Sequence, residues 1–302
     1  FFSKPKTISS EFLLVGLVIV SVGVSKKIFL SDPLGPGVSY VYDTMRETTT
    51  FSEVWIASIA FTLQVYFDFS GYSDIAIGTA RLFGFNLKQN FAFPYFSRDI
   101  AEFWRRWHMS LSTWFRDYLY IPLGGSRGGT WMKVRNTFII FLVSGFWHGA
   151  NWTFIAWGGL NAVYFLPLLL LKRNRTNLGV VAEGRMLPNL RELWQMGTTF
   201  LLTVLAWVFF RAESLSMALG FLKGIVTQGL LKIPVFAGRS SALFTVLFVA
   251  IFLITEWINR DNAHSLMTLT KNKTVRYIIY YVLVFTILSN SDSKQEFIYF
   301  QF

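Results

Sequence analysis

The stretch Val143-Ser-Gly-Phe-Trp-His-Gly-Ala-Asn-Trp152 decides the fold class, because it places one ionisable side chain, His148, inside a long apolar run. No Lys, Arg, Asp or Glu occurs from Thr137 to Leu171. As one helix this run would be roughly 50 Å long, which exceeds the hydrocarbon thickness of a bilayer. We therefore predict a break at Gly149-Ala150-Asn151, since Gly disfavours helix interiors and Asn favours turns. His148 then lies at a break at membrane depth.

The composition indicates an integral membrane protein. Hydrophobic residues make up 53% of the 302 residues and charged residues only 15%, whereas a soluble domain carries about 25% charged residues. The 11 Trp and 32 Phe suit helices that meet both lipid tails and headgroups. The net charge of +11 comes from Lys and Arg between apolar runs, so membrane lipid is the expected partner and nucleic acid is not. The lack of Cys excludes disulfides and a Cys nucleophile.

Other apolar runs predict further membrane-spanning helices, which are residues 12–24, 54–67, 193–210, 240–255 and 277–291. An amphipathic helix is predicted where one helical face carries Leu215, Leu219, Leu222 and Val226. From Asp68 to Lys133, aromatic residues alternate with Arg, Asp and Gly, which is typical of segments that line a buried cavity. We expect an all-α, multi-pass transmembrane helix bundle with irregular or re-entrant helices, forming one domain over residues 1–302.

His148 is the strongest candidate for chemistry. An ionisable group at membrane depth is costly unless it has a function or a partner. The alternative is a packing His bonded to a neighbouring hydroxyl or carbonyl. Gly145 and Gly149 leave room for another backbone or a thin acyl chain beside the ring. An imidazole can take up and return a proton near neutral pH, so His148 is predicted to be catalytic.

A second His, His108, lies in Phe103-Trp-Arg-Arg-Trp-His-Met-Ser-Leu-Ser-Thr-Trp114. We predict a helix that Ser97 caps, with Asp99 in its first turn and an i,i+4 pair between Glu102 and Arg106. Four polar side chains are expected near one face, namely Arg98, Arg105, Ser112 and Arg116. A surface helix whose arginines meet lipid phosphate is the alternative. His108 itself is assigned to the site.

Asp68 and Asp74 lie in Tyr66-Phe-Asp-Phe-Ser-Gly-Tyr-Ser-Asp74, at the end of an apolar run, where a carboxylate must pair or lose its charge. Pairing with nearby Arg is predicted, and orientation of a catalytic His is the alternative. The segment Leu123-Gly-Gly-Ser-Arg-Gly-Gly129 lacks the spacing of a phosphate loop and is predicted to be a turn. His264 is assigned no role. Two His without a third ligand at suitable spacing predict no metal site.

Several of these stretches resemble the membrane-bound O-acyltransferase family, most closely the bacterial branch that acts in alginate O-acetylation and teichoic-acid D-alanylation. The resemblance rests on residues 66–78, 103–114, 118–125, 144–149 and 296–302. It implies a central acyl-transfer tunnel. It also implies that His148 is the family's invariant His, that His108 is its second motif His, and that further helices precede residue 1 in the full-length protein.

The resemblance further implies an O-acyltransferase of the cell membrane. The co-substrate would be an acyl thioester, either acetyl-CoA or a carrier-protein thioester, with no tightly bound cofactor. The acyl group, acetyl as a family-level expectation, would cross the membrane to a hydroxyl of a polysaccharide, with help from an extracytoplasmic acyltransferase partner protein. We expect Asp68 and Asp74 to support the site, and the substrate-binding residues to be Trp104, Arg105, Ser112, Trp147 and Asn151.

Two other functions are compatible with a membrane helix bundle. A secondary transporter would bind a solute or proton at broken helices, but such proteins commonly show paired repeats and none is found here. A noncatalytic scaffold of a polysaccharide-export complex would leave the costly placement of His148 unexplained.

Overall fold

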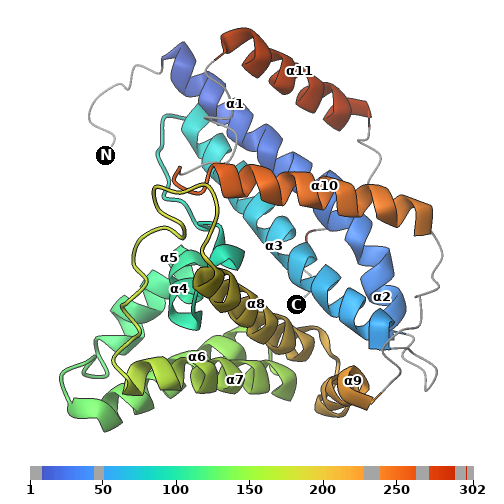
Figure 1. The fold of residues 1–302 in the computed structure, drawn as a ribbon. Coiled ribbons are helices and arrows are strands. Elements are labelled where there is room, and N and C mark those ends of the chain that lie inside the picture. Colours follow the sequence, from blue (N-terminus) through green and yellow to red (C-terminus); the bar gives the residue numbers. More distant parts are fainter. Residues whose placement is uncertain (1–8, 44–50, 228–238, 263–271, 290–296, 298–302) are drawn as a thin grey trace. The chain divides into compact units, whose positions relative to one another are not determined.

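The computed structural model describes residues 9–43, 51–227, 239–262, 272–289 and 297, and every regular element within these ranges is helical (Figure 1). Three helical runs are long and apolar enough to cross a membrane, namely Phe12–Asp43, Trp152–Leu170 and Leu190–Arg211. An all-α architecture is therefore confirmed for this part of the chain. His264 and residues 298–302 lie outside the described residues.

The chain divides into two compact units. One unit comprises the described residues within 1–34, 63–92 and 240–301, and the other comprises those within 35–62 and 93–239. Helix α3 (Phe51–Leu82) contributes its first part to the second unit and the rest to the first. The single-domain organisation stays a prediction.

The first unit is built on a close approach of α1 (Ser10–Ser25) and α3. A Cβ added at Gly23 would lie 2.5 Å from the Gly71 carbonyl oxygen, and one at Gly78 would lie 2.6 Å from that of Gly16. Only glycine allows the two backbones to approach so closely. Helix α10 (Arg239–Ile258) packs Phe248 on Phe29 and Phe252 on Phe67, and α11 (Lys273–Ser289) packs on α1.

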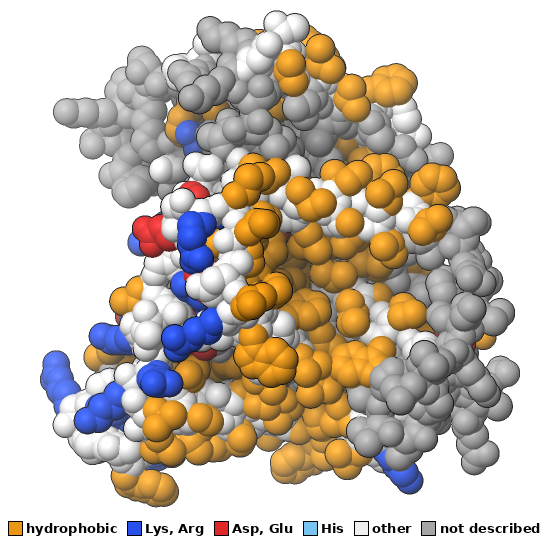
Figure 2. Space-filling view, in the orientation of Figure 1, with side chains coloured by type: hydrophobic (Ala, Val, Ile, Leu, Met, Phe, Trp, Pro, Cys, Tyr) orange, Lys and Arg blue, Asp and Glu red, His pale blue; other side chains and the backbone are white. Residues whose placement is uncertain are grey.

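Exposed apolar side chains lie along α10, as expected for a helix whose outer face meets lipid. They contribute to the broad hydrophobic areas of Figure 2, and they are Leu243, Phe244, Val246, Leu247, Phe248, Ile251 and Ile254. The span expected over residues 240–255 therefore corresponds to a regular helix with an apolar outer face.

A buried charge cluster follows α1, where a π-helical segment, Lys26–Ser31, continues the helix. Lys27 Nζ lies 2.9 Å from Asp68 Oδ1 and 2.8 Å from Asp32 Oδ1, and Lys26 Nζ lies 2.8 Å from Asp74 Oδ2. Among the described residues, both carboxylates are thus ion-paired with Lys, where Arg was predicted. The partners differ because α3 turns these carboxylates toward the π-helical segment that follows α1 and carries both lysines.

These ion pairs also explain how α3 can continue through residues 68–82. The span predicted at 54–67 lies within α3, which continues as a regular helix to Leu82. Charge neutralisation by the lysines removes much of the cost of burying the carboxylates inside a helix.

The second unit centres on the hairpin of α6 (Gly129–His148) and α7 (Trp152–Leu170), which lie side by side in Figure 1. Helix α8 (Leu190–Arg211) packs on α7, and α9 (Leu215–Thr227) packs on both. Helix α2 (Gly35–Asp43) adds Tyr42, which stacks on Phe221 of α9 at 4.3 Å. A helix, α9, is thus present where the amphipathic helix was predicted, and its buried residues include Ala218 and Phe221.

The segment around His108 differs from its prediction. One helix capped by Ser97 was expected, but Asp99 is the N-cap, and its Oδ1 accepts a hydrogen bond from the Glu102 backbone N–H at 2.7 Å. The helix then stops, giving α4 (Ile100–Arg106) and α5 (Met109–Phe115), because His108 adopts a left-handed conformation with φ 44°. The polar residues expected on one face therefore belong to separate elements. The Gly-rich segment 123–129 is a turn with positive φ at Gly124 and Gly125, as predicted.

Candidate functional site

His148 is the last residue of α6, and aromatic rings from three helices surround its imidazole. Ring centroids lie 5.3 Å away for Trp157 of α7 and 5.0 Å away for Phe210 of α8. Phe154 of α7 lies at 6.3 Å and the preceding Trp147 at 5.2 Å. The imidazole therefore faces an apolar wall, where an electrostatic or hydrogen-bonding contact is stronger than in water.

The predicted break after His148 is confirmed, and Asn151 holds it in place. The Asn151 side chain caps α7 by accepting a hydrogen bond from the Thr153 backbone N–H at 3.1 Å. Its Nδ2 donates to the Glu213 carbonyl oxygen at 3.0 Å, just beyond the end of α8. One side chain thus fixes the start of α7 to the end of α8 beside His148.

The fold brings His108 near His148 although 40 positions separate them in the sequence. Burial and, to a smaller extent, the interaction with His148 together lower the pKa of the His108 imidazole to about 4. The two imidazoles therefore lie within range of each other's charge. Ser110 Oγ lies 3.4 Å from His108 Nδ1. His108 is neutral at pH 7, so its ring can both donate and accept a hydrogen bond.

Tryptophan rings packed against one another connect the two His-bearing segments. Trp107, which precedes His108, contacts Trp207 of α8 with ring centroids 5.2 Å apart. Trp207 stacks on Trp157 at 5.7 Å, and Trp157 contacts His148. Trp104 of α4 also packs edge to face on Trp157, at 5.7 Å. Large rigid rings with few rotamers hold such a geometry at low entropic cost.

The side chains predicted to bind substrate already make contacts within the protein. Trp104 Nε1 donates to Asn161 Oδ1 at 3.3 Å, and Ser112 Oγ donates to the carbonyl oxygen of Trp104 at 3.3 Å. Arg105 donates through Nη1 and Nη2 to the carbonyl oxygens of Asn174 and Asn177, at 2.8 and 2.7 Å. Trp147 is half exposed. Substrate binding by these residues and by Asn151 stays a prediction, as does a supporting role for Asp68 and Asp74.

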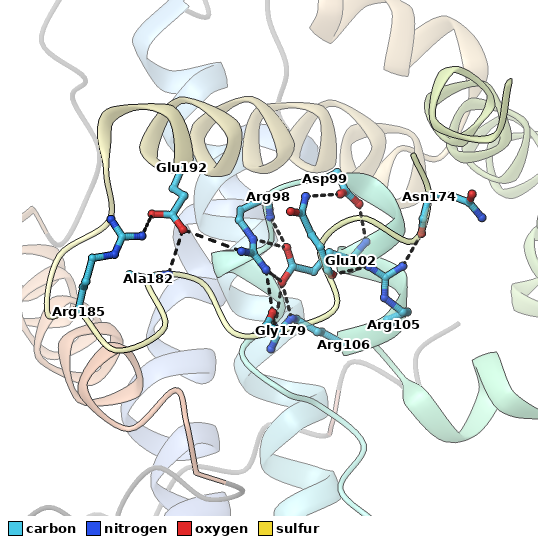
Figure 3. A network of polar contacts seen from close by, with 11 residues as sticks. Arg98, Asp99, Glu102, Arg105, Arg106, Asn174, Gly179, Ala182, Arg185 and Glu192 are labelled. Carbon is cyan, nitrogen blue, oxygen red and sulfur yellow. Dashed lines mark hydrogen bonds and ion pairs between the residues drawn. The ribbon is translucent and has the colours of Figure 1, made fainter. Parts of the chain in front are cut away.

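The sequence did not single out the aromatic wall around His148 or the contacts of Glu102 beyond its pair with Arg106. Trp157, Trp207 and Phe210 were assigned only to apolar runs, because such a run does not indicate which residues an aromatic side chain contacts. Glu102 was paired with Arg106 only. Its equal spacing from Arg98, also i,i+4, was the available signal for the larger network in Figure 3.

Among the described residues, no group of three or more His, Cys, Asp and Glu side chains is arranged to hold a metal ion. The two imidazoles beside this apolar wall can transfer protons and form hydrogen bonds.

Comparison with known proteins identifies relatives that share this region. Residues 3–191 match the membrane-bound O-acyltransferase family. A probable alginate O-acetylase of Pseudomonas aeruginosa is 47% identical over 196 residues, which are 65% of this chain and 35% of the relative. A peptidoglycan O-acetyltransferase of Helicobacter pylori is 40% identical over 212 residues, 70% of this chain and 38% of the relative.

A teichoic acid D-alanyltransferase of Streptococcus thermophilus is 45% identical over 101 residues, 31% of this chain and 24% of the relative. The chain thus spans little more than a third of the length of the curated relatives that it matches best. The family match covers well over half of the chain and includes both His-bearing segments. This chain belongs to the membrane-bound O-acyltransferase family.

Proposed function

We propose that this chain carries the catalytic centre of a multi-pass membrane O-acyltransferase that acylates a hydroxyl group. The observation that carries the proposal is the placement of His148 at the end of α6, walled by Trp157 and Phe210 and close to His108. An imidazole in an apolar wall beside a second, neutral imidazole suits proton transfer from an acceptor hydroxyl. Membership of the family supports the same reaction class.

In the proposed reaction, His148 removes the proton from the acceptor hydroxyl as its oxygen attacks the carbonyl carbon of an acyl thioester. A C–O bond forms, the C–S bond breaks, and the departing thiolate receives the proton that His148 took. General-base catalysis of this kind contributes about 10²- to 10⁴-fold in rate. His108 orients the donor or the acceptor by a hydrogen bond. The aromatic wall keeps water from hydrolysing the thioester.

The relatives support a proposal for the substrates and the location. The donor is an acyl thioester, either acetyl-CoA or an acylated carrier protein. Acetyl is the proposed acyl group, because the probable alginate O-acetylase and the peptidoglycan O-acetyltransferase match 65% and 70% of this chain. The acceptor is a hydroxyl of a cell-surface polysaccharide or of peptidoglycan. We place the protein in the cell membrane, with the acyl group passing through the helix bundle to an acceptor or a partner acyltransferase on the outer side.

The test compares His148→Gln with the parent in the full-length protein in membranes. Both receive radiolabelled acetyl-CoA or acetylated carrier protein, and label is followed into polysaccharide or partner protein. We expect the parent to transfer label and the variant, at equal protein level, to lose at least about 99% of the rate. Transfer by the variant at the parental rate would refute the role of His148. A parent that transfers nothing from either donor but moves a solute across the membrane would favour the transporter alternative.

A further inference from the structure

We propose that Glu102 is a positioning residue, which holds an arginine clamp that fixes His108 relative to His148. The clamp consists of Arg98, Arg105 and Arg106, which bind the segment 172–189 between α7 and α8 (Figure 3). The inference rests on the proposed function for its catalytic readout, but the geometry it concerns can be measured without activity.

Glu102 is the centre of the clamp. Its side chain is 1% exposed, and it accepts hydrogen bonds from two guanidinium groups. Arg98 donates to Glu102 through Nε and Nη2, both at 3.0 Å, and through its backbone N–H at 2.8 Å. Arg106 approaches Glu102 Oε1 through Nη2 at 2.9 Å. A single carboxylate therefore joins Arg98, two residues before α4, to the last residue of α4.

The arginines reach across to the segment between α7 and α8. Arg98 Nη2 and Arg106 Nη2 both donate to the Gly179 carbonyl oxygen, at 2.7 and 3.0 Å. Arg105 donates to the carbonyl oxygens of Asn174 and Asn177, as described above. On the same side, Asp99 Oδ2 accepts from Asn177 Nδ2 at 2.6 Å. Four side chains, those of Arg98, Asp99, Arg105 and Arg106, thus tie α4 and the residues just before it to one connecting segment.

The clamp connects α4, which precedes His108, to the segment between the two helices whose aromatic rings contact His148. His108 follows Arg106 by two residues, so the orientation of α4 sets where its imidazole lies. The clamped segment joins α7, which carries Trp157, to α8, which carries Phe210, and both rings contact His148. A rigid link between α4 and this segment therefore controls the spacing of the imidazoles. Misplacement by about 1 Å can cost about 100-fold in rate.

Glu102 is central to the clamp because its carboxylate offsets the repulsion between the neighbouring guanidinium groups. Three guanidinium groups lie together, and the side chains of Arg98 and Arg106 are only 12% and 16% exposed. Without a carboxylate between them, two neighbouring partly buried cations repel each other. Burial and the neighbouring cations Arg106 and Arg98 lower the pKa of Arg105, which Asp99 and Glu102 oppose. Removing the negative charge of Glu102 should therefore loosen the whole clamp.

The experiment compares Glu102→Gln with Glu183→Gln in the full-length protein, reconstituted in membranes. Glu183 is an exposed carboxylate of the clamped segment, so it supplies a matched control on the same side of the site. For Glu102→Gln we expect kcat for acyl transfer to fall about tenfold to a hundredfold with the donor KM within about twofold of the parent. Glu183→Gln should match the parent in both.

A second readout does not depend on activity. Diethylpyrocarbonate is added to each protein, and modification of His108 is quantified by peptide mapping. We expect Glu102→Gln, but not Glu183→Gln, to increase the modification rate of His108 several-fold. Should the parent show no acyl transfer, the proposed function fails while this readout still decides on the clamp.

Arg105→Lys supplies a variant that keeps the charge and loses the two-pronged contact with Asn174 and Asn177. If Glu102→Gln does not fold, the same pair of measurements on Arg105→Lys decides. A fall in kcat with increased His108 modification supports the clamp. A raised donor KM with unchanged kcat and unchanged modification would overturn it and assign Arg105 to substrate binding. A Glu102→Gln protein that has parental kcat and parental His108 reactivity would also overturn the proposal.

Discussion

Substituting Gly158 by Ala tests how closely α6 and α7 pack beneath the site. A Cβ at Gly158 would lie 2.2 Å from the Phe141 carbonyl oxygen, and one at Gly145 would lie 2.3 Å from that of Phe154. The two glycines thus form a reciprocal pair, each against the backbone of the opposite helix. Backbone atoms cannot rotate away as a side chain can, so the helices must separate.

The magnitude follows from two opposing terms. Relieving a 2.2 Å contact requires the helices to separate by more than 1 Å at this level, and overpacking of this kind costs about 1 to 3 kcal/mol. Ala in place of Gly in a helix interior returns up to about 1 kcal/mol. At the neighbouring Gly159, a Cβ would meet only Leu142 Cδ2, at 3.7 Å, an ordinary contact. Gly158→Ala should therefore lower the free energy of unfolding, whereas Gly159→Ala should leave it unchanged or raise it.

The assay is thermal unfolding of the detergent-solubilised protein, followed by tryptophan fluorescence. Gly158→Ala should lower the unfolding midpoint, and Gly159→Ala should leave it equal or raise it. Gly158→Ala should also reduce acyl transfer, because Trp157 adjoins the substituted position and contacts His148. Equal midpoints for the two variants would refute the close packing of α6 on α7.

Two further predictions concern buried charge. The pKa of His108 is lowered from 6.5 to about 4 in the folded protein, so the unfolded chain binds more protons between these values. The free energy of unfolding should then fall by up to about 3 kcal/mol as pH drops from about 6.5 to 4, and His108→Gln should remove this part of the pH dependence. Lys27→Met leaves the Asp32 and Asp68 carboxylates buried without this cation. We expect it to destabilise the protein by about 3 to 5 kcal/mol in chemical denaturation, and an equal effect of Lys88→Met, on an exposed side chain, would contradict the ion-pair explanation.

The sequence predicted the helices that depend on local information. Length, apolar composition and the Gly149-Ala150-Asn151 break were enough to predict that α6 ends at His148 and that α7 begins shortly afterwards. The i,i+4 pair of Glu102 and Arg106 was also predictable, because helical spacing alone brings the two side chains together. His148 stood out as an ionisable side chain in an apolar run, and His108 stood out in a stretch of Trp, Arg and Ser.

Local patterns were misleading where a distant segment changed the balance of energies. Arg was predicted as the partner of Asp68 and Asp74, but Lys27 and Lys26, from the segment that follows α1, neutralise them. The left-handed conformation of His108, which divides one expected helix in two, is rarely adopted by non-glycine residues and has no signal in the sequence.

The sequence by itself thus determined the class of the protein, its main helices and the identity of its two candidate imidazoles, because hydrophobicity and helical periodicity are properties of contiguous residues. Only the tertiary structure decided what those imidazoles face. The wall of Trp157 and Phe210, the partners of Arg105 and the central place of Glu102 all arise from segments far apart in the chain. Which segments meet depends on the packing of whole helices, and no single stretch of sequence encodes it.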